Sequence, residues 1–294
     1  MIAALLSFAL LFQAQEALQP ATYASPSGKR ALAIEPIARD SARARMLLDG
    51  VEQWSEELPF VPVKAAVAED GRAAAYAYAI DPSGESGELL VILLAPDGKV
   101  LARVPHALKS SRGAHGHIAF TPVVRGLVLQ PELGRVILAV YDNEPPDLHA
   151  KLWTYDLSTG APLVRQRADI DEKNDHLIVL LLGLRAIPES PLLLMSWYRR
   201  DSSSEPVRRD ACFQLLDQDL RIVWTLELPH DYERGGDGRA DLRFMAELLD
   251  NPPILATPPR RFELRAVAAA QRVLFQVELV EGAWRVSELS RVPY

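Results

Sequence analysis

The chain has a single cysteine, Cys212, so it can form no disulfide bond within itself. It also has no basic run, because 39 acidic residues outnumber 32 basic ones and give a net charge of −7. An acidic surface is a poor match for a phosphate backbone, so we expect no nucleic-acid partner. The apolar run Met1–Phe12 is too short to span a bilayer, and we expect no transmembrane helix in the mature chain.

The N-terminal run MIAALLSFALLF is followed by polar Gln13 and small Ala14. It resembles the apolar region of a secretory signal, although no Lys or Arg precedes it. We expect residues 1–17 to be a signal peptide, cleaved after Ala14 or Ala17, and the protein to be exported to the periplasm or the outside. A buried N-terminal strand and an uncleaved anchor remain open alternatives.

A repeat of about 60 residues organises the rest of the chain. The stretch 151–167, KLWTYDLSTGAPLVRQR, reads as two short strands around a glycine turn, and residues 89–104, 211–226 and 273–288 align with it without gaps. The turn positions are Gly98, Gly160, Leu220 and Gly282, in steps of 62, 60 and 62 residues. Several strands per unit at a fixed period predict a β-propeller.

Each unit has the order strand, tight turn, strand, loop, strand, tight turn, strand. Five such units predict an all-β propeller of five four-stranded blades, as one domain over residues 18–294 and as a monomer. A sixth blade is the alternative, if 60–68 or 231–253 holds one. Continuous apolar runs such as Val91–Leu94 predict strands buried on both faces.

The third unit carries a resemblance to a known family. A Gly-His pair at 116–117, the turn PELG at 131–134, Asp142 and the segment YDLSTG at 155–160 resemble a WD40 repeat. The resemblance implies a structural hydrogen-bond network of His117, Asp142 and Tyr155. It covers about 50 residues, so it indicates a WD40-like architecture, and exported quinoprotein-like propellers are equally compatible.

The long polar loops are expected on one face of such a propeller, with the tight turns and little side-chain chemistry on the other. We expect ligand binding on the loop-rich face. Its predicted residues are His106, His115, His149, His176, His230, Asp169 and Asp171.

Two functions follow from this arrangement. The first is a non-catalytic exported propeller that binds a protein, peptide or glycan partner through the loop-rich face. The alternative is a metal-dependent propeller hydrolase with a divalent metal over the central channel. Imidazole nitrogens suit zinc or a similar ion, and the predicted ligands are His115, His117, His176 and His230.

Overall fold

The computed structural model describes most of the chain after residue 18. The described ranges are 19–80, 86–112, 118–141, 150–167, 177–187, 190–201, 208–230, 254–257, 261–268 and 271–293. The chain divides into two compact units, Met1–Asp169 and Ile170–Tyr294, and each is described by itself.

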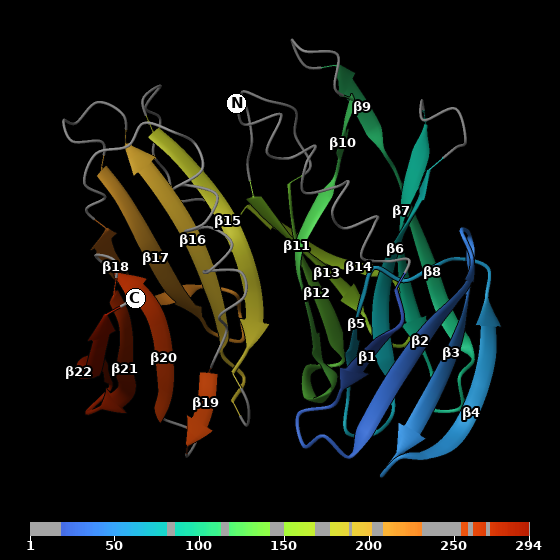
Figure 1. Cartoon of the computed structure of the whole chain (residues 1–294), viewed down its shortest axis with the longest axis horizontal. Helices are drawn as coiled ribbons and strands as arrows, with labels where there is room; N and C mark the ends of the chain where they lie inside the picture. The colour runs from blue at the N-terminus through green and yellow to red at the C-terminus, as the bar shows by residue number, and fades with distance from the viewer. Residues whose placement is uncertain are drawn as a thin grey trace. The chain divides into compact units, whose positions relative to one another are not determined.

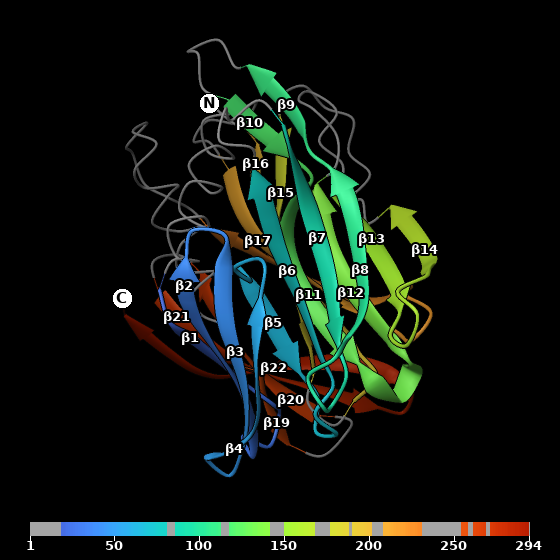
Figure 2. The same ribbon diagram turned by 90° about the vertical axis from the view of Figure 1, so that its right-hand side faces the viewer.

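The first unit holds three four-stranded antiparallel sheets, which we call blades 1 to 3 (Figures 1 and 2). Blade 1 consists of β1 (Ala21–Ala24), β2 (Arg30–Ala38), β3 (Ser41–Leu48) and β4 (Val51–Leu58). Blade 2 consists of β5 (Lys64–Val67), β6 (Ala73–Ile80), β7 (Gly87–Leu94) and β8 (Val100–Ala107). Blade 3 consists of β11 (Val123–Gln130), β12 (Arg135–Tyr141), β13 (Ala150–Asp156) and β14 (Pro162–Arg167), with the 3-10 turn η1 (Pro131–Leu133) after β11.

A two-stranded ribbon separates blades 2 and 3 along the chain. It pairs β9 (Lys109–Arg112) with β10 (Ile118–Thr121), and Figure 2 shows it beyond the end of β8. No strands were predicted for this stretch. The ribbon is therefore an insertion that the repeat period concealed.

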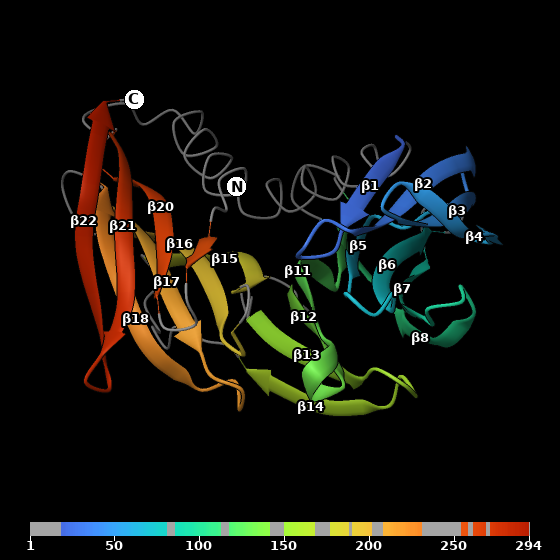
Figure 3. The ribbon, with the colours of Figure 1, turned by 90° about the horizontal axis from the view of Figure 1, so that it is seen from below.

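The described residues of the second unit form two further four-stranded sheets, blades 4 and 5, which Figure 3 shows from below. Blade 4 consists of β15 (Leu177–Ala186), β16 (Leu193–Asp201), β17 (Arg208–Leu216) and β18 (Ile222–His230). Blade 5 consists of β19 (Ile254–Thr257), β20 (Arg261–Ala268), β21 (Gln271–Val280) and β22 (Ala283–Pro293). Strands β17 and β18 contact β20, so the two sheets pack on one another.

Five four-stranded sheets, each built from one contiguous stretch, confirm the predicted all-β fold, a β-propeller of about five blades. Residues 60–68 hold no extra blade, because β5 is the first strand of blade 2. Residues 231–253, the other place considered for a sixth blade, lie outside the described residues. Within the described ranges, no helix has the length and apolar character needed to cross a bilayer.

The tight turn before the last strand of each of blades 2 to 5 marks the repeat period. All four predicted turn residues have positive φ: 89° at Gly98, 71° at Gly160, 62° at Leu220 and 82° at Gly282. An L side chain is strained in this region, so Leu220 departs from the preference for glycine. In this turn Asp217 Oδ1 accepts the N–H groups of Asp219 and Arg221, each at 2.9 Å.

Blade 2 shows why the middle strands are apolar throughout. Residues Leu89–Leu94 of β7 are all buried, and their side chains alternate between two hydrophobic clusters. Leu90 and Ile92 pack in the cluster shared with blade 1, and Leu89 and Val91 in the cluster shared with blade 3. The predicted burial on both faces is confirmed for this strand.

Turn glycines also let neighbouring blades approach closely. The turn at Gly98 lies on Trp54 of blade 1, and the turn at Gly160 lies on Ala102 of blade 2. A Cβ at Gly160 would stand 2.5 Å from the Cβ of Ala102, well inside van der Waals contact. Glycine is therefore required at this turn for two reasons, its backbone conformation and the space that it leaves.

The substitution Gly160→Ala is expected to lower the free energy of unfolding by about 2–4 kcal/mol, since it adds a steric overlap to the strain of positive φ. Gly50→Ala is the matched control, because Gly50 has φ of 80° at the same turn of blade 1 and nothing lies within 4 Å of its added Cβ. The control should cost about 1 kcal/mol. Chemical denaturation measures both, and equal losses would contradict the close-approach explanation.

Candidate functional site

Of the six histidines, only His106 has a side chain that the structure describes. The backbone of His230 ends β18. The other predicted site residues lie outside the described residues, namely His115, His117, His149, His176, Asp142, Asp169 and Asp171. Their predicted roles, including the metal site and the WD40-like network, therefore remain predictions. Within the described ranges, no three His, Cys, Asp or Glu side chains are grouped to hold a metal ion.

His106 lies near the end of β8 on the side that faces blade 3, where its imidazole is half-buried. Its Nε2 is 2.7 Å from the hydroxyl oxygen of Tyr155, and its ring centroid is 4.5 Å from that of Trp153. Tyr155 is only 1% exposed. The hydrogen bond and the ring contact together fix the orientation of the imidazole, as a proton-transfer group requires.

Two predicted site residues, His106 and Tyr155, are thus brought together across two blades. The WD40 resemblance instead assigned Tyr155 to a network with His117 and Asp142. The alternation of β8 explains the position of His106, because Ala102, Val104 and His106 point to the same side.

A second aromatic residue lies in the same row of blade 2. Tyr78 of β6 is directly opposite Leu89 of β7, and Leu89 is directly opposite His106 of β8. Opposite residues in paired strands project from the same face, and strands lie 4.7–4.9 Å apart, so the Cα atoms of Tyr78 and His106 are about 10 Å apart. We call Tyr78, Leu89 and His106 the blade 2 row.

The Tyr78 hydroxyl contacts the entry to blade 3. It accepts a hydrogen bond from the Val124 N–H at 3.0 Å, and its own donation to the Pro122 carbonyl is long, at 3.5 Å. Burial raises the pKa of Tyr78 to about 12, although the Val124 N–H and the positive charge of Arg125 act in the opposite direction. The hydroxyl is therefore protonated at neutral pH and able to donate.

Arg125, whose positive charge acts on this hydroxyl, lies at an irregularity of the sheet. The register between β11 and β12 shifts between Val124 and Gly126, which leaves Arg125 as the extra residue of a β-bulge. Its side chain is half-buried, and its Nε is buried without a hydrogen-bond partner. Among the described residues no carboxylate pairs with it. A charged residue before glycine in the apolar stretch VVRGLVL is the sequence signal that could have identified it.

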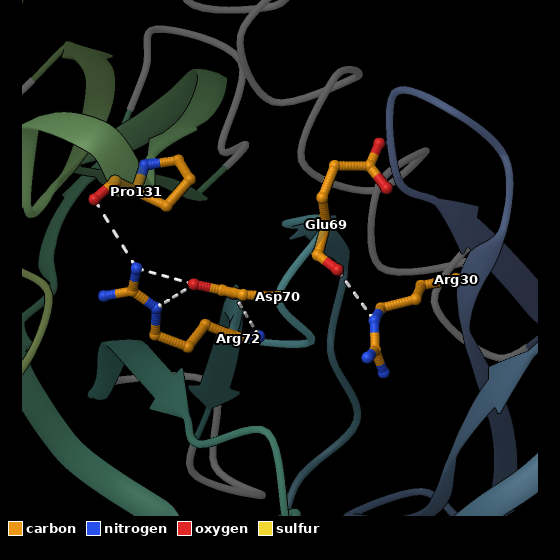
Figure 4. A network of polar contacts seen from close by, with 5 residues as sticks. All are labelled: Arg30, Glu69, Asp70, Arg72 and Pro131. Atoms are coloured by element: carbon orange, nitrogen blue, oxygen red, sulfur yellow. Dashed lines mark hydrogen bonds and ion pairs between the residues drawn. The ribbon is translucent and has the colours of Figure 1, made fainter.

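The tight turns after the first strands of blades 1 to 3 carry more polar side-chain contacts than the sequence indicated (Figure 4). Arg30 Nε donates to the Glu69 carbonyl at 2.8 Å, and Arg72 is 2.6 Å from Asp70 and 3.5 Å from the Pro131 carbonyl oxygen. The Ser27 hydroxyl and backbone N–H hold the pKa of Glu69 below its usual range. Since these contacts join the same turn of three consecutive blades, they form a structural clamp.

A polar cluster of the second unit lies near the ends of its middle strands. Asp210, whose side chain is 2% exposed, is 3.5 Å from Arg199 Nε, and Glu227 is 3.5 Å from Arg199 Nη1. Arg199 and Asp210 are directly opposite in β16 and β17. Arg199 and Asp210 therefore compensate one another's charge within one sheet, which is consistent with a structural role.

Comparisons with known proteins find similarity only at the level of the fold. No protein-family model matches the chain, and no curated protein matches it. Hydrazine synthase from Kuenenia stuttgartiensis is similar over 93% of this chain and 74% of its own, with 10% identity and a TM-score of 0.50.

Two other solved structures share less of their geometry with this chain. The GH93 α-L-arabinofuranosidase of Fusarium graminearum is similar over 94% of this chain and 82% of its own, with 10% identity and a TM-score of 0.47. An apocarotenoid oxygenase of Synechocystis is similar over 91% of this chain and 59% of its own, with 12% identity and a TM-score of 0.42.

These comparisons correct the functional expectation. We expected a non-catalytic propeller that binds a protein, peptide or glycan, and this prediction is wrong, because hydrazine synthase, the similar structure with a TM-score of 0.50, is an enzyme by name. The sequence has no G-x-S-x-G motif and no legible Ser/His/Asp order, but catalytic groups that come from separate strands need not form a contiguous motif.

Loss of the Tyr78 proton is expected to destabilise the first unit at high pH. Because the folded pKa of about 12 lies above the unfolded value of about 10, the full stability is present below pH 10. On the order of 2 kcal/mol should be lost as the pH rises from 10 to 12. Unfolding by urea across this pH range measures the loss.

Tyr78→Phe should lose less stability over this range than the wild type. It should start about 1–3 kcal/mol lower at neutral pH, because the hydrogen bond between the Val124 N–H and the tyrosine hydroxyl is removed. Tyr23→Phe is the control, since the Tyr23 hydroxyl also bridges two blades, by donating to the Val63 carbonyl at 3.0 Å. An alkaline loss in Tyr78→Phe as large as in the wild type would contradict this assignment.

Proposed function

We propose that this chain is a β-propeller hydrolase in which His106 is the proton-transfer residue and Tyr155 positions it. The observation that carries the proposal is the 2.7 Å contact between His106 Nε2 and the Tyr155 hydroxyl at a half-buried position between two blades. The similarity of the fold to that of a named enzyme, hydrazine synthase, is compatible with catalysis on this scaffold.

Hydrolysis is the simplest reaction that these groups can support, because water is the only co-reactant. The imidazole removes a proton from the water molecule as its oxygen bonds to the electrophilic carbon of the substrate. It then returns the proton to the leaving group as the bond to that group breaks. Tyr155 is buried, so it acts through His106 by selecting the tautomer and the ring orientation.

A substrate panel tests this proposal. Purified protein is assayed with 4-nitrophenyl esters and 4-nitrophenyl glycosides, each with and without a carboxylate on the acyl or sugar part. We expect His106→Gln to lower kcat/KM about 100-fold, the usual contribution of a proton-transfer residue. Tyr155→Phe should lower kcat about tenfold and displace the pH profile, since the imidazole loses a hydrogen-bond partner.

Tyr23→Phe serves as the control for loss of an inter-blade hydroxyl. It removes a contact between blades 1 and 2 and should leave kcat/KM unchanged. Turnover by the wild type that is unaffected by His106→Gln would refute the assigned role. No turnover on any member of the panel would count against a hydrolase.

We also propose that the protein is exported after removal of its N-terminal segment. The apolar run Met1–Phe12 with Gln13 and Ala14 after it supports this. Mass spectrometry of the protein from its native host should find a chain that begins after Ala14 or Ala17. Recovery of the intact chain, Met1 included, from the cytosol would overturn the proposal.

A further inference from the structure

We propose that Arg125 and Tyr78 form a binding site for a small organic carboxylate. The inference deepens the proposed function, because it gives the charge of the substrate at the same blade 2 row. It concerns binding rather than turnover, so it stands or falls by a separate measurement.

The positive charge of Arg125 favours a negatively charged ligand. A guanidinium is charged at every physiological pH, and taking it out of water is costly unless an anion compensates it. The described residues supply Arg125 with no ion pair, and its Nε is buried without a hydrogen-bond partner. Arg125 as a whole is nevertheless half-buried rather than enclosed.

The hydroxyl of Tyr78 supplies the second donor. The Val124 N–H, at 3.0 Å, occupies one acceptor position of the hydroxyl oxygen. The hydroxyl proton has only a 3.5 Å contact with the Pro122 carbonyl, at the outer limit of a hydrogen bond. A carboxylate oxygen beside Arg125 would offer this proton a shorter and charge-assisted bond.

Arg125 and Tyr78 together favour a ligand with a single negative charge. A guanidinium presents a fork of N–H groups that matches the two oxygens of a carboxylate, and the tyrosine hydroxyl is neutral. One positive charge therefore compensates a monoanion fully, whereas a phosphate dianion would retain excess charge. Because Tyr78 and His106 share a row, the carboxylate would lie on the same face of blade 2 as the proton-transfer residue.

Fluorine NMR with trifluoroacetate as the probe tests the site in the full-length mature protein. The line width of the probe is followed as protein is added at constant ionic strength. We expect saturable broadening with a dissociation constant on the order of 1 mM, typical of a single charge-assisted contact. Acetate should displace the probe at a lower concentration than inorganic phosphate does.

Variants locate the binding. Arg125→Gln should weaken it at least about tenfold, and Arg125→Lys less, because lysine keeps the charge and loses the fork. Tyr78→Phe should weaken it about threefold or more through loss of one donor. Arg285→Gln is the matched control for the change in net charge, since Arg285 is exposed and paired with Glu281, and it should bind as the wild type does. Circular dichroism verifies that each variant is folded.

Failure to bind trifluoroacetate by the wild type would overturn the inference, whatever the variants do. Equal weakening in Arg125→Gln and Arg285→Gln would also overturn it, because the effect would then be one of net charge. Carboxylate binding without any hydrolysis would support this site and reject the proposed reaction. Hydrolysis without binding of trifluoroacetate would support the reaction and reject this site.

Discussion

Burial of both faces of the inner sheets is the constraint on which the rest of this structure depends. A middle strand such as β7 has no polar face, so it is stable only between two other sheets. The outer strand β8 has the opposite character, with one face inward and one face exposed. The side chains between two neighbouring sheets then set the distance between the sheets. Small residues at turns, such as Gly160, allow a close approach.

Aromatic residues satisfy their polar atoms across this apolar layer. Each extends from one blade and places its polar tip on the next, so that the residue is half-buried and the hydroxyl or indole N–H is still bonded. The examples in the first unit are Tyr23 to Val63, Trp54 to Pro96, and Val124 to Tyr78. In all three, one partner is a backbone group. The contact of Tyr155 with His106 differs because both partners are side chains that can exchange a proton.

The fold was predictable because it depends on period and alternation, which a sequence displays directly. The turn at Leu220 was located correctly despite the missing glycine, since the aligned strands on both sides fixed its position. The candidate site was predictable only in part. His106 was placed on the loop-rich face, but nothing in the sequence near it indicates Tyr155, which is 49 residues away.

Tyr78 and Arg125 were not predicted as site residues, for a related reason. A tyrosine in an alternating strand and an arginine in an apolar one each look like ordinary surface or core residues. Their significance arises from a β-bulge and from the approach of two blades, and both are properties of paired strands rather than of a single stretch. The ribbon of β9 and β10 was missed because four-residue strands carry too little pattern to recognise.

The sequential order of strands in every described sheet bears on how the protein is made. Since each sheet pairs only strands that follow one another in the chain, its hydrogen bonds can form as soon as the ribosome has released about 40 to 50 residues. The apolar faces of that sheet, however, stay uncovered until the next sheet has been synthesised. At each point of translation the newest blade is the vulnerable one. Stalled or truncated chains would therefore expose the unpaired edge and the apolar face of one sheet. Chaperones bind this kind of surface.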